Sequence, residues 1–263
     1  MNLLRDLWRH RLLVAGLVRR DFQVRSVRAV WGNLWLVIQP AIQILIYTVI
    51  FAEVLRARLP GSNDQMGYAL YVCVGLITWN YFSDIVMRSQ TLFAQHADLL
   101  KTIRFPRSAL PVALVISASI QFAIVCGLFS LMLIVVGRWP GIILVEALPL
   151  LVCQVLLAVG LGLLTGTINV FFRDVGEAVA VFLQFGFWLT PIVYPLAIVP
   201  EALRSVLVWN PMLHIIGGYQ GLLLEGTAPN WQVVGLIAIV SGALCVAAWG
   251  VFRALSPDLV DEL

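Results

Sequence analysis

Charged residues are scarce in this sequence of 263 residues, where Asp, Glu, Lys and Arg together make up 12%. Soluble domains contain about 25% charged and ~45–50% apolar residues, whereas this chain is 61% hydrophobic, with a mean hydropathy of +0.95. A single soluble core cannot bury so much apolar surface, and no long segment has the composition of a soluble domain. The composition therefore predicts an all-α integral membrane protein without an appended enzyme domain.

Motifs for catalysis and nucleotide binding are also missing. Lysine occurs once, at Lys101, and Leu99 and Leu100 precede it in place of the glycine-rich loop of a GxxxxGK[ST] motif. The sequence contains neither a GxSxG nor an HExxH motif. Glu146 is nearly the only ionisable residue within the expected spans, which disfavours ion-coupled transport. We therefore expect no catalytic residues and no cofactor bound by this chain.

Cysteine and histidine lack the spacing of metal or disulfide sites. The four cysteines lie in apolar runs without a CxxC motif, and the three histidines are scattered. The sequence predicts neither a metal site nor a disulfide framework. These residues are Cys73, Cys126, Cys153 and Cys245, and His10, His96 and His214.

Long runs without Asp, Glu, Lys or Arg are abundant, and each approaches the ~20 residues that cross a bilayer as a helix. We interpret six of the seven runs as spans. The run Ser205–Leu224 is weaker, because Asn210-Pro211 and Gly217-Gly218 break helices, so we expect a re-entrant external segment there. The other six runs are Ala29–Ala52, Gln65–Ser83, Ser108–Gly137, Ala147–Phe172, Ala178–Pro200 and Gly226–Phe252.

The distribution of basic residues sets the expected orientation. With six spans and both termini in the cytoplasm, thirteen Lys or Arg residues lie inside and four outside, as the positive-inside rule favours. The external four are Arg56, Arg58, Arg138 and Arg204. We expect a multi-pass protein of a bacterial inner membrane.

Residues 1–28 form an expected amphipathic helix at the cytoplasmic surface, with Leu4, Trp8 and Leu12 on its apolar face. A simple topology anchor is the alternative. Arg20 and Arg25 are candidates to bind the pyrophosphate of an incoming glycolipid, since guanidinium groups match phosphate oxygens. Binding to anionic lipid headgroups explains them equally well.

The second cytoplasmic loop, residues 94–108, contains a short amphipathic run that ends at a proline. Such a run favours docking into a groove of a cytoplasmic partner, although an ordinary positive-inside loop has the same composition. The candidate contact residues are Leu99, Leu100, Lys101, Ile103, Arg104, Phe105, Pro106 and Arg107.

Aromatic residues gather in the first and fifth expected spans. Flat rings pack against the C–H faces of sugars, so these residues are candidates to line a channel for a sliding polymer. Interfacial belts and bundle packing are the alternative. The candidates are Trp35, Tyr47, Phe51, Phe185, Trp188 and Tyr194. In the fourth span, Gly160, Gly162 and Gly166 favour the close approach of another helix.

Several short motifs occur in a familiar order between about residues 20 and 230, and together they are fairly specific. The chain resembles the membrane subunits of ABC type 2 exporters, particularly those for O-antigen, capsular polysaccharide and teichoic acid. The motifs are Arg20-Asp21-Phe22-x-x-Arg25-Ser26, Gly32-x-x-Trp35-x-x-x-Gln39-Pro40, Leu99-Leu100-Lys101-x-x-x-Phe105-Pro106-Arg107 with Leu110-Pro111, Phe172-Arg173-Asp174-Val175, Trp188-x-x-Pro191-x-x-Tyr194-Pro195 and Leu207-x-x-Asn210-Pro211-Met212.

The resemblance implies one transmembrane domain over residues 1–263, with a six-span bundle at 29–254 and a cytoplasmic tail at 255–263. It also implies a homodimer, a separate ABC ATPase that binds ATP and Mg, and a coupling helix in the loop 94–108. An external gate segment at 196–228 would contain Asn210, Pro211, His214 and Tyr219.

Export of a lipid-linked polysaccharide is the expected function, with no nucleic-acid partner. Export of a drug or lipid by the same machinery, or a membrane scaffold for glycan synthesis, are the alternatives.

Overall fold

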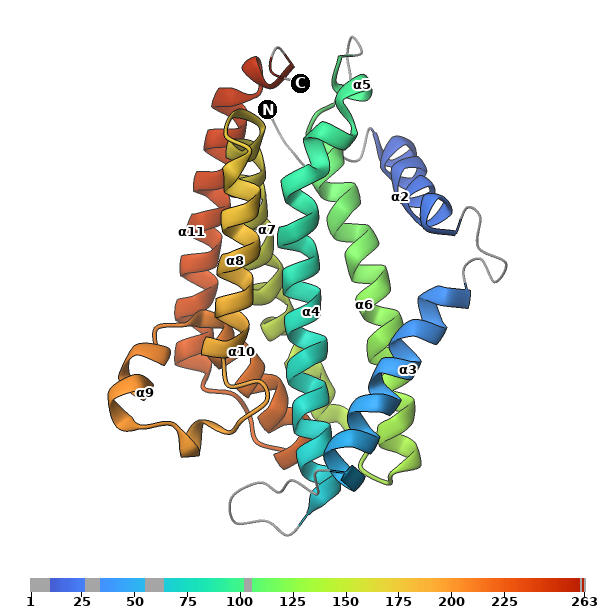
Figure 1. The fold of residues 1–263 in the computed structure, drawn as a ribbon, viewed down its shortest axis with the longest axis vertical. Helices are drawn as coiled ribbons and strands as arrows, with labels where there is room; N and C mark the ends of the chain where they lie inside the picture. The colour runs from blue at the N-terminus through green and yellow to red at the C-terminus, as the bar shows by residue number, and fades with distance from the viewer. Residues whose placement is uncertain (1–9, 27–33, 55–63, 102–105, 261, 263) are drawn as a thin grey trace.

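The computed structural model describes residues 10–26, 34–54, 64–101, 106–260 and 262, and within these ranges it contains helices and no strands (Figure 1). The N-terminal segment 1–9, with the predicted apolar residues Leu4 and Trp8, lies outside the described residues. The elements are α2 (Arg11–Ser26), α3 (Trp35–Val49), η2 (Ile50–Val54), α4 (Gln65–Gln95), α5 (Ala97–Leu100), α6 (Ala109–Val135), η3 (Gly141–Glu146), α7 (Ala147–Phe171), α8 (Asp174–Leu189), η4 (Leu196–Ile198), α9 (Glu201–Leu207), α10 (Pro211–Gln220), η5 (Gly221–Glu225), α11 (Trp231–Leu255) and η6 (Asp258–Val260).

Five of the described helices are long and apolar enough to cross a membrane, and they match five of the expected spans. The expected span at Ala178–Pro200 corresponds to α8, a shorter helix of 16 residues. Helix α8 ends because Thr190 precedes Pro191, which disfavours helical geometry, and Thr190 has ψ of 131°. The count of six spans stays a prediction. The five long segments are Trp35–Ala52, Met66–Gln95, Ala109–Val135, Leu144–Phe171 and Trp231–Leu255.

Helix α7 lies at the centre of the bundle and packs against both α4 and α11. Its three glycines permit this arrangement, as predicted. A Cβ added at Gly160 would lie 2.9 Å from Leu244 of α11, and one at Gly162 would lie 2.5 Å from the Ser89 hydroxyl of α4. At Gly166 the Cβ would lie 2.3 Å from the backbone carbonyl oxygen of Ser89. The small residues therefore set the spacing of the two helix pairs.

The predicted break in the run Ser205–Leu224 is confirmed at Asn210-Pro211, between α9 and α10. Asn210 caps α10, since its side chain accepts a hydrogen bond from the Met212 backbone N–H, and Pro211 occupies the first turn. The prediction that Gly217-Gly218 breaks the helix is wrong, because both residues lie inside α10. Gly218 instead lets α10 approach Leu150 of α7.

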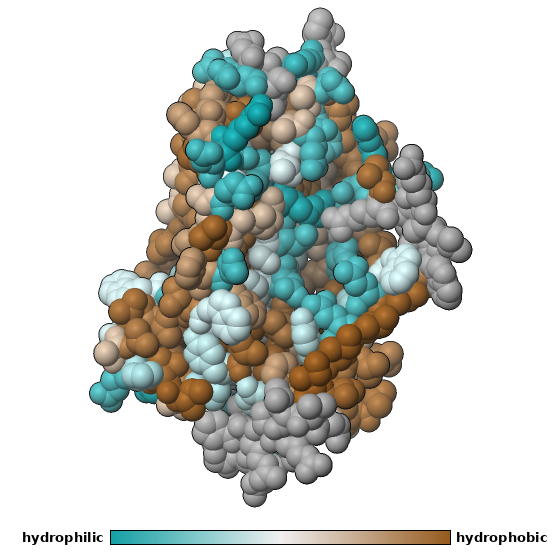
Figure 2. Space-filling model, in the orientation of Figure 1, coloured by the Kyte–Doolittle hydropathy of each residue, from teal (hydrophilic) through white to brown (hydrophobic). Residues whose placement is uncertain are grey.

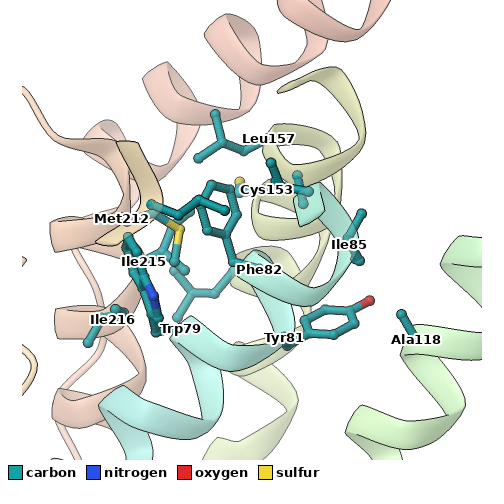
Figure 3. Packing of buried hydrophobic residues seen from close by; sticks show 14 of the residues in the cluster. Trp79, Tyr81, Phe82, Ile85, Ala118, Cys153, Leu157, Met212, Ile215 and Ile216 are labelled. Carbon is teal, nitrogen blue, oxygen red and sulfur yellow. The ribbon is translucent and has the colours of Figure 1, made fainter. Parts of the chain in front are cut away.

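The buried face of α10 packs on α4 and α7, where Met212, Ile215 and Ile216 lie near Trp79 and Phe82 (Figure 3). Tyr81 of α4 points the other way, toward Ala118 of α6 (Figure 3). Tyr81 and Ala118 belong to the same buried cluster as Trp79, so the apolar core continues across α4 from α10 to α6.

Helix α2 lies at the side of the bundle, where Val14 packs against Ala109 and Ala113 of α6 (Figure 1). Leu12, predicted on an apolar face, is exposed. Placement of α2 at a membrane surface stays a prediction.

Candidate transport site

The predicted partner-contact loop lies at the end of the molecule that also holds the described C-terminal residues (Figure 1). Helix α5 buries Leu100, which is 4% exposed, while Leu99 is half-buried and Lys101 is exposed. Ile103, Arg104 and Phe105 lie outside the described residues.

Beyond that gap, Pro106 and Arg107 precede α6 and are half-buried. The Arg107 guanidinium donates hydrogen bonds to the backbone carbonyl of Ser256 and, at 2.9 Å, to its hydroxyl. The loop is thus joined to the segment that follows α11, a contact that sequence reasoning did not anticipate.

An ion-pair cluster joins α2 to α4. Arg88 lies 2.7 Å from Asp21 of α2 and 3.4 Å from Asp84, one turn earlier on α4. Helix α4 continues past the expected end of its span at Ser83 to Gln95, and it includes Asp84 and Arg88. The spacing i, i+4, i+8 of Asn80, Asp84 and Arg88 was the available signal.

Arg20, a candidate for phosphate binding, is exposed and lines a cavity of about 230 Å³ between α2, α4 and α6. Asp21, Arg88 and His96 line the same cavity. The side chain of Arg25, the second candidate, lies outside the part of the chain that the structure describes.

The six candidate channel aromatics do not converge in one chain. Trp35 on α3 is exposed, and Phe51 in η2 contacts Tyr68 with ring centroids 5.8 Å apart. Phe185 and Trp188 lie on the outer face of α8, 66% and 61% exposed. Helices α3 and α8 lie on opposite sides of α4 (Figure 1). The Tyr194 hydroxyl donates to the Trp188 carbonyl at 2.6 Å.

The candidate gate segment, residues 196–228, lies at the end of the bundle opposite α5 (Figure 1). The Asn210 carboxamide donates to the Thr190 hydroxyl at 2.8 Å, so the start of α10 is joined to the end of α8. His214 is 2.8 Å from the Val208 carbonyl, and Tyr219 is buried with its hydroxyl without a hydrogen-bond partner among the described groups. The segment therefore has a defined conformation held by polar contacts.

A cavity of about 290 Å³ with both polar and apolar lining residues lies between α3, α4 and α6, on the side of α4 to which Tyr81 points. Figure 2 shows hydrophilic side chains gathered in the middle of this face, flanked by hydrophobic ones. Of the predicted channel residues only Tyr47 lines this cavity. Its polar lining consists of Gln39, Gln43, Tyr47, Asn80, Asp84 and Gln121, together with the Tyr81 hydroxyl.

Comparisons with known proteins identify the family of this chain. The family model for the ABC-2 type transporter matches residues 13–224. The chain is 28% identical to an O-antigen export system permease protein, RfbA, of Myxococcus xanthus, over 100% of both chains. It is also 28% identical to an RfbA protein of Klebsiella pneumoniae, covering 95% of each chain. A polysialic acid transport protein, KpsM, of Escherichia coli is 24% identical over 84% of this chain and 86% of its own. The chain belongs to the ABC-2 type transporter family.

Proposed function

We propose that this chain is the permease subunit of an ATP-driven exporter that moves a lipid-linked polysaccharide across the inner membrane. The observation that carries the proposal is the full-length similarity to a protein named as an O-antigen export permease. The polysialic acid transport protein extends the similarity to a second glycan class. The sequence contains no GxxxxGK[ST] motif, which supports a separate ABC ATPase as the proposed site of ATP hydrolysis.

The proposed complex contains two copies of this chain and two ATPase subunits. Two arguments favour a homodimer. The aromatic residues of α3 and α8 lie apart in one chain, and the outer face of α8 exposes Phe182, Phe185 and Trp188. A second copy would bring such faces around a shared channel. In this arrangement α8 crosses the membrane as the sixth span, and the segment 196–228 is a re-entrant external gate.

Both termini are proposed to lie in the cytoplasm, where the loop from Leu99 to Arg107 transmits ATPase closure to the spans. The buried Leu100 and the Arg107 hydrogen bonds to Ser256 support a loop that moves together with the helices it joins. Arg20 and Arg25 are proposed to meet the lipid pyrophosphate.

Depletion of this protein in its native cell tests the function directly. We expect labelled lipid-linked glycan to accumulate on the cytoplasmic face of the inner membrane and to disappear from the surface. A substitution of the Walker lysine in the copurifying ATPase should have the same effect. Normal surface glycan after depletion would contradict the proposal and favour drug or lipid export. Loss of glycan synthesis itself would favour a scaffold.

The variant Arg107→Ala tests the role of the loop. Removing the guanidinium deletes two hydrogen bonds between the loop and Ser256, each worth about 0.5–1.5 kcal/mol. We expect ATP hydrolysis by the purified complex to persist while surface glycan falls severalfold. Arg253→Ala, which removes an exposed arginine from the last turn of α11, is the matched control. Equal export by both variants would contradict a coupling role for Arg107.

A further inference from the structure

The cavity between α3, α4 and α6 places many polar groups inside apolar helices. Gln39 and Gln43 lie on α3, Asn80 and Asp84 on α4, and Gln121 on α6, and all five line the same space. The pairs on α3 and α4 are each spaced i, i+4, so these two helices turn a polar face toward the cavity, and α6 adds Gln121. Polar groups at membrane depth are costly unless they are satisfied, and their concentration marks a functional site.

Two of these carboxamides are available to a ligand. Asn80 and Gln39 are exposed, and neither side chain hydrogen-bonds another group in the part of the chain that the structure describes. The Gln43 carboxamide, in contrast, donates to the Tyr47 hydroxyl at 2.9 Å, which orients both groups at the cavity wall. The cavity therefore combines fixed and unoccupied hydrogen-bonding groups.

The chemistry of the lining favours hydroxyl groups over anions. Carboxamides offer one acceptor and two donors each, and a carboxylate accepts from hydroxyl pairs. Among the described lining residues Asp84 is the one charged group, and none is a lysine or arginine. A phosphate would meet the Asp84 carboxylate, while the Arg88 guanidinium that lies 3.4 Å from Asp84 is not part of the lining, and this is unfavourable.

Aromatic rings complete the wall. Tyr81 and Phe122 stack with ring centroids 4.2 Å apart, and both line the cavity beside Tyr47. The Tyr81 hydroxyl lies 2.7 Å from the Ser119 hydroxyl, so the ring is held in place. Rings next to amides and a carboxylate match a molecule with apolar C–H faces and hydroxyl edges, which is the chemistry of a sugar.

The size limits the ligand. A cavity of about 290 Å³ is at the lower end of the ~300–1,000 Å³ found for small-molecule sites. It suits one sugar unit and is too small for a folded length of polymer.

We propose that the cavity between α3, α4 and α6 binds a single neutral sugar unit of the transported glycan through Gln39, Asn80 and Asp84. This inference rests on the proposed function and adds to it a defined binding site. The site differs from the predicted aromatic channel lining, because of those six residues only Tyr47 contributes to it.

Saturation-transfer NMR on the permease–ATPase complex in lipid nanodiscs tests the inference. The probes are methyl α-D-mannopyranoside, methyl β-D-galactopyranoside and methyl α-L-rhamnopyranoside. We expect at least one glycoside to bind the wild type. Asn80→Leu should weaken that binding about three- to tenfold, the range that corresponds to one lost hydrogen bond. Gln39→Leu should act similarly, and Gln232→Leu, an exposed carboxamide on α11, should bind as the wild type does.

The outcomes separate this inference from the proposed function. Absence of glycoside binding by the wild type overturns the sugar site, and so does equal binding by the wild type and Asn80→Leu. In either case depletion of the protein can still abolish export, so the proposed function is tested separately. Normal surface glycan after depletion overturns the proposed function and this inference with it. Thermal unfolding of each variant complex establishes that it is folded. The Asn80 side chain has no hydrogen-bond partner among the described residues, so its replacement should not lower the Tm.

Discussion

Gly166→Ala is expected to reduce the yield of folded protein sharply. The added methyl group would lie 2.3 Å from the Ser89 backbone carbonyl oxygen and 2.9 Å from its carbonyl carbon. Backbone atoms cannot rotate away as a side-chain end can, so α7 and α4 must separate. Overpacking of this kind costs about 1–3 kcal/mol and occasionally more. The effect should be large, because α4 and α7 form one of the main helix contacts of the bundle.

The measurement is the amount of monodisperse protein after detergent extraction, together with its Tm. Gly127→Ala is the matched control, because a Cβ at Gly127 on α6 would meet nothing within 4 Å. Alanine is favoured over glycine in a helix by about 1 kcal/mol, so this control should be neutral or slightly stabilising. Similar Tm values for the two variants would show that α4 and α7 do not approach as closely as the structure indicates.

Arg88→Ala is expected to destabilise the junction of α2 and α4. The substitution removes the guanidinium that Asp21 and Asp84 share, and leaves two carboxylates beside each other. Exposed ion pairs contribute about 0–1 kcal/mol, whereas removal of one partner from a buried pair costs ~3–5 kcal/mol. Arg88 is 23% exposed, so we expect an intermediate loss of about 1–3 kcal/mol.

Neutralising Asp21 and Asp84 distinguishes whether Arg88 stabilises the junction of α2 and α4 through its charge or through its packing. Adding Asp21→Asn and Asp84→Asn to Arg88→Ala should restore much of the lost Tm, because the two side chains that Arg88 contacted are then uncharged. If the triple variant is as unstable as Arg88→Ala alone, the guanidinium contributes through its packing rather than through its charge.

Spans and chain breaks could be predicted from the sequence alone. A lipid environment demands long apolar helices, so the five long segments follow directly from the charge-free runs. The start of α10 at Asn210-Pro211 is also determined by local sequence. A capping side chain and a proline define a helix start, and no contact with distant residues is needed. The motifs that indicated the family are local patterns too.

The tertiary structure alone determined which helices and side chains contact one another. Gly217-Gly218 remains helical, because packing of α10 against α4 and α7 outweighs the weak intrinsic preference of glycine for other conformations. The partner of Arg88 lies 67 residues away at Asp21, and no spacing rule links two helices so far apart in sequence.

The cavity between α3, α4 and α6 also depends on the tertiary packing of the helices. Gln39 shares a helix face with Gln43, and Asn80 shares one with Asp84, but only the packing of α3, α4 and α6 brings these faces around one space. Periodicity determines which residues share a face of a helix, whereas the packing of the whole bundle determines what that face meets.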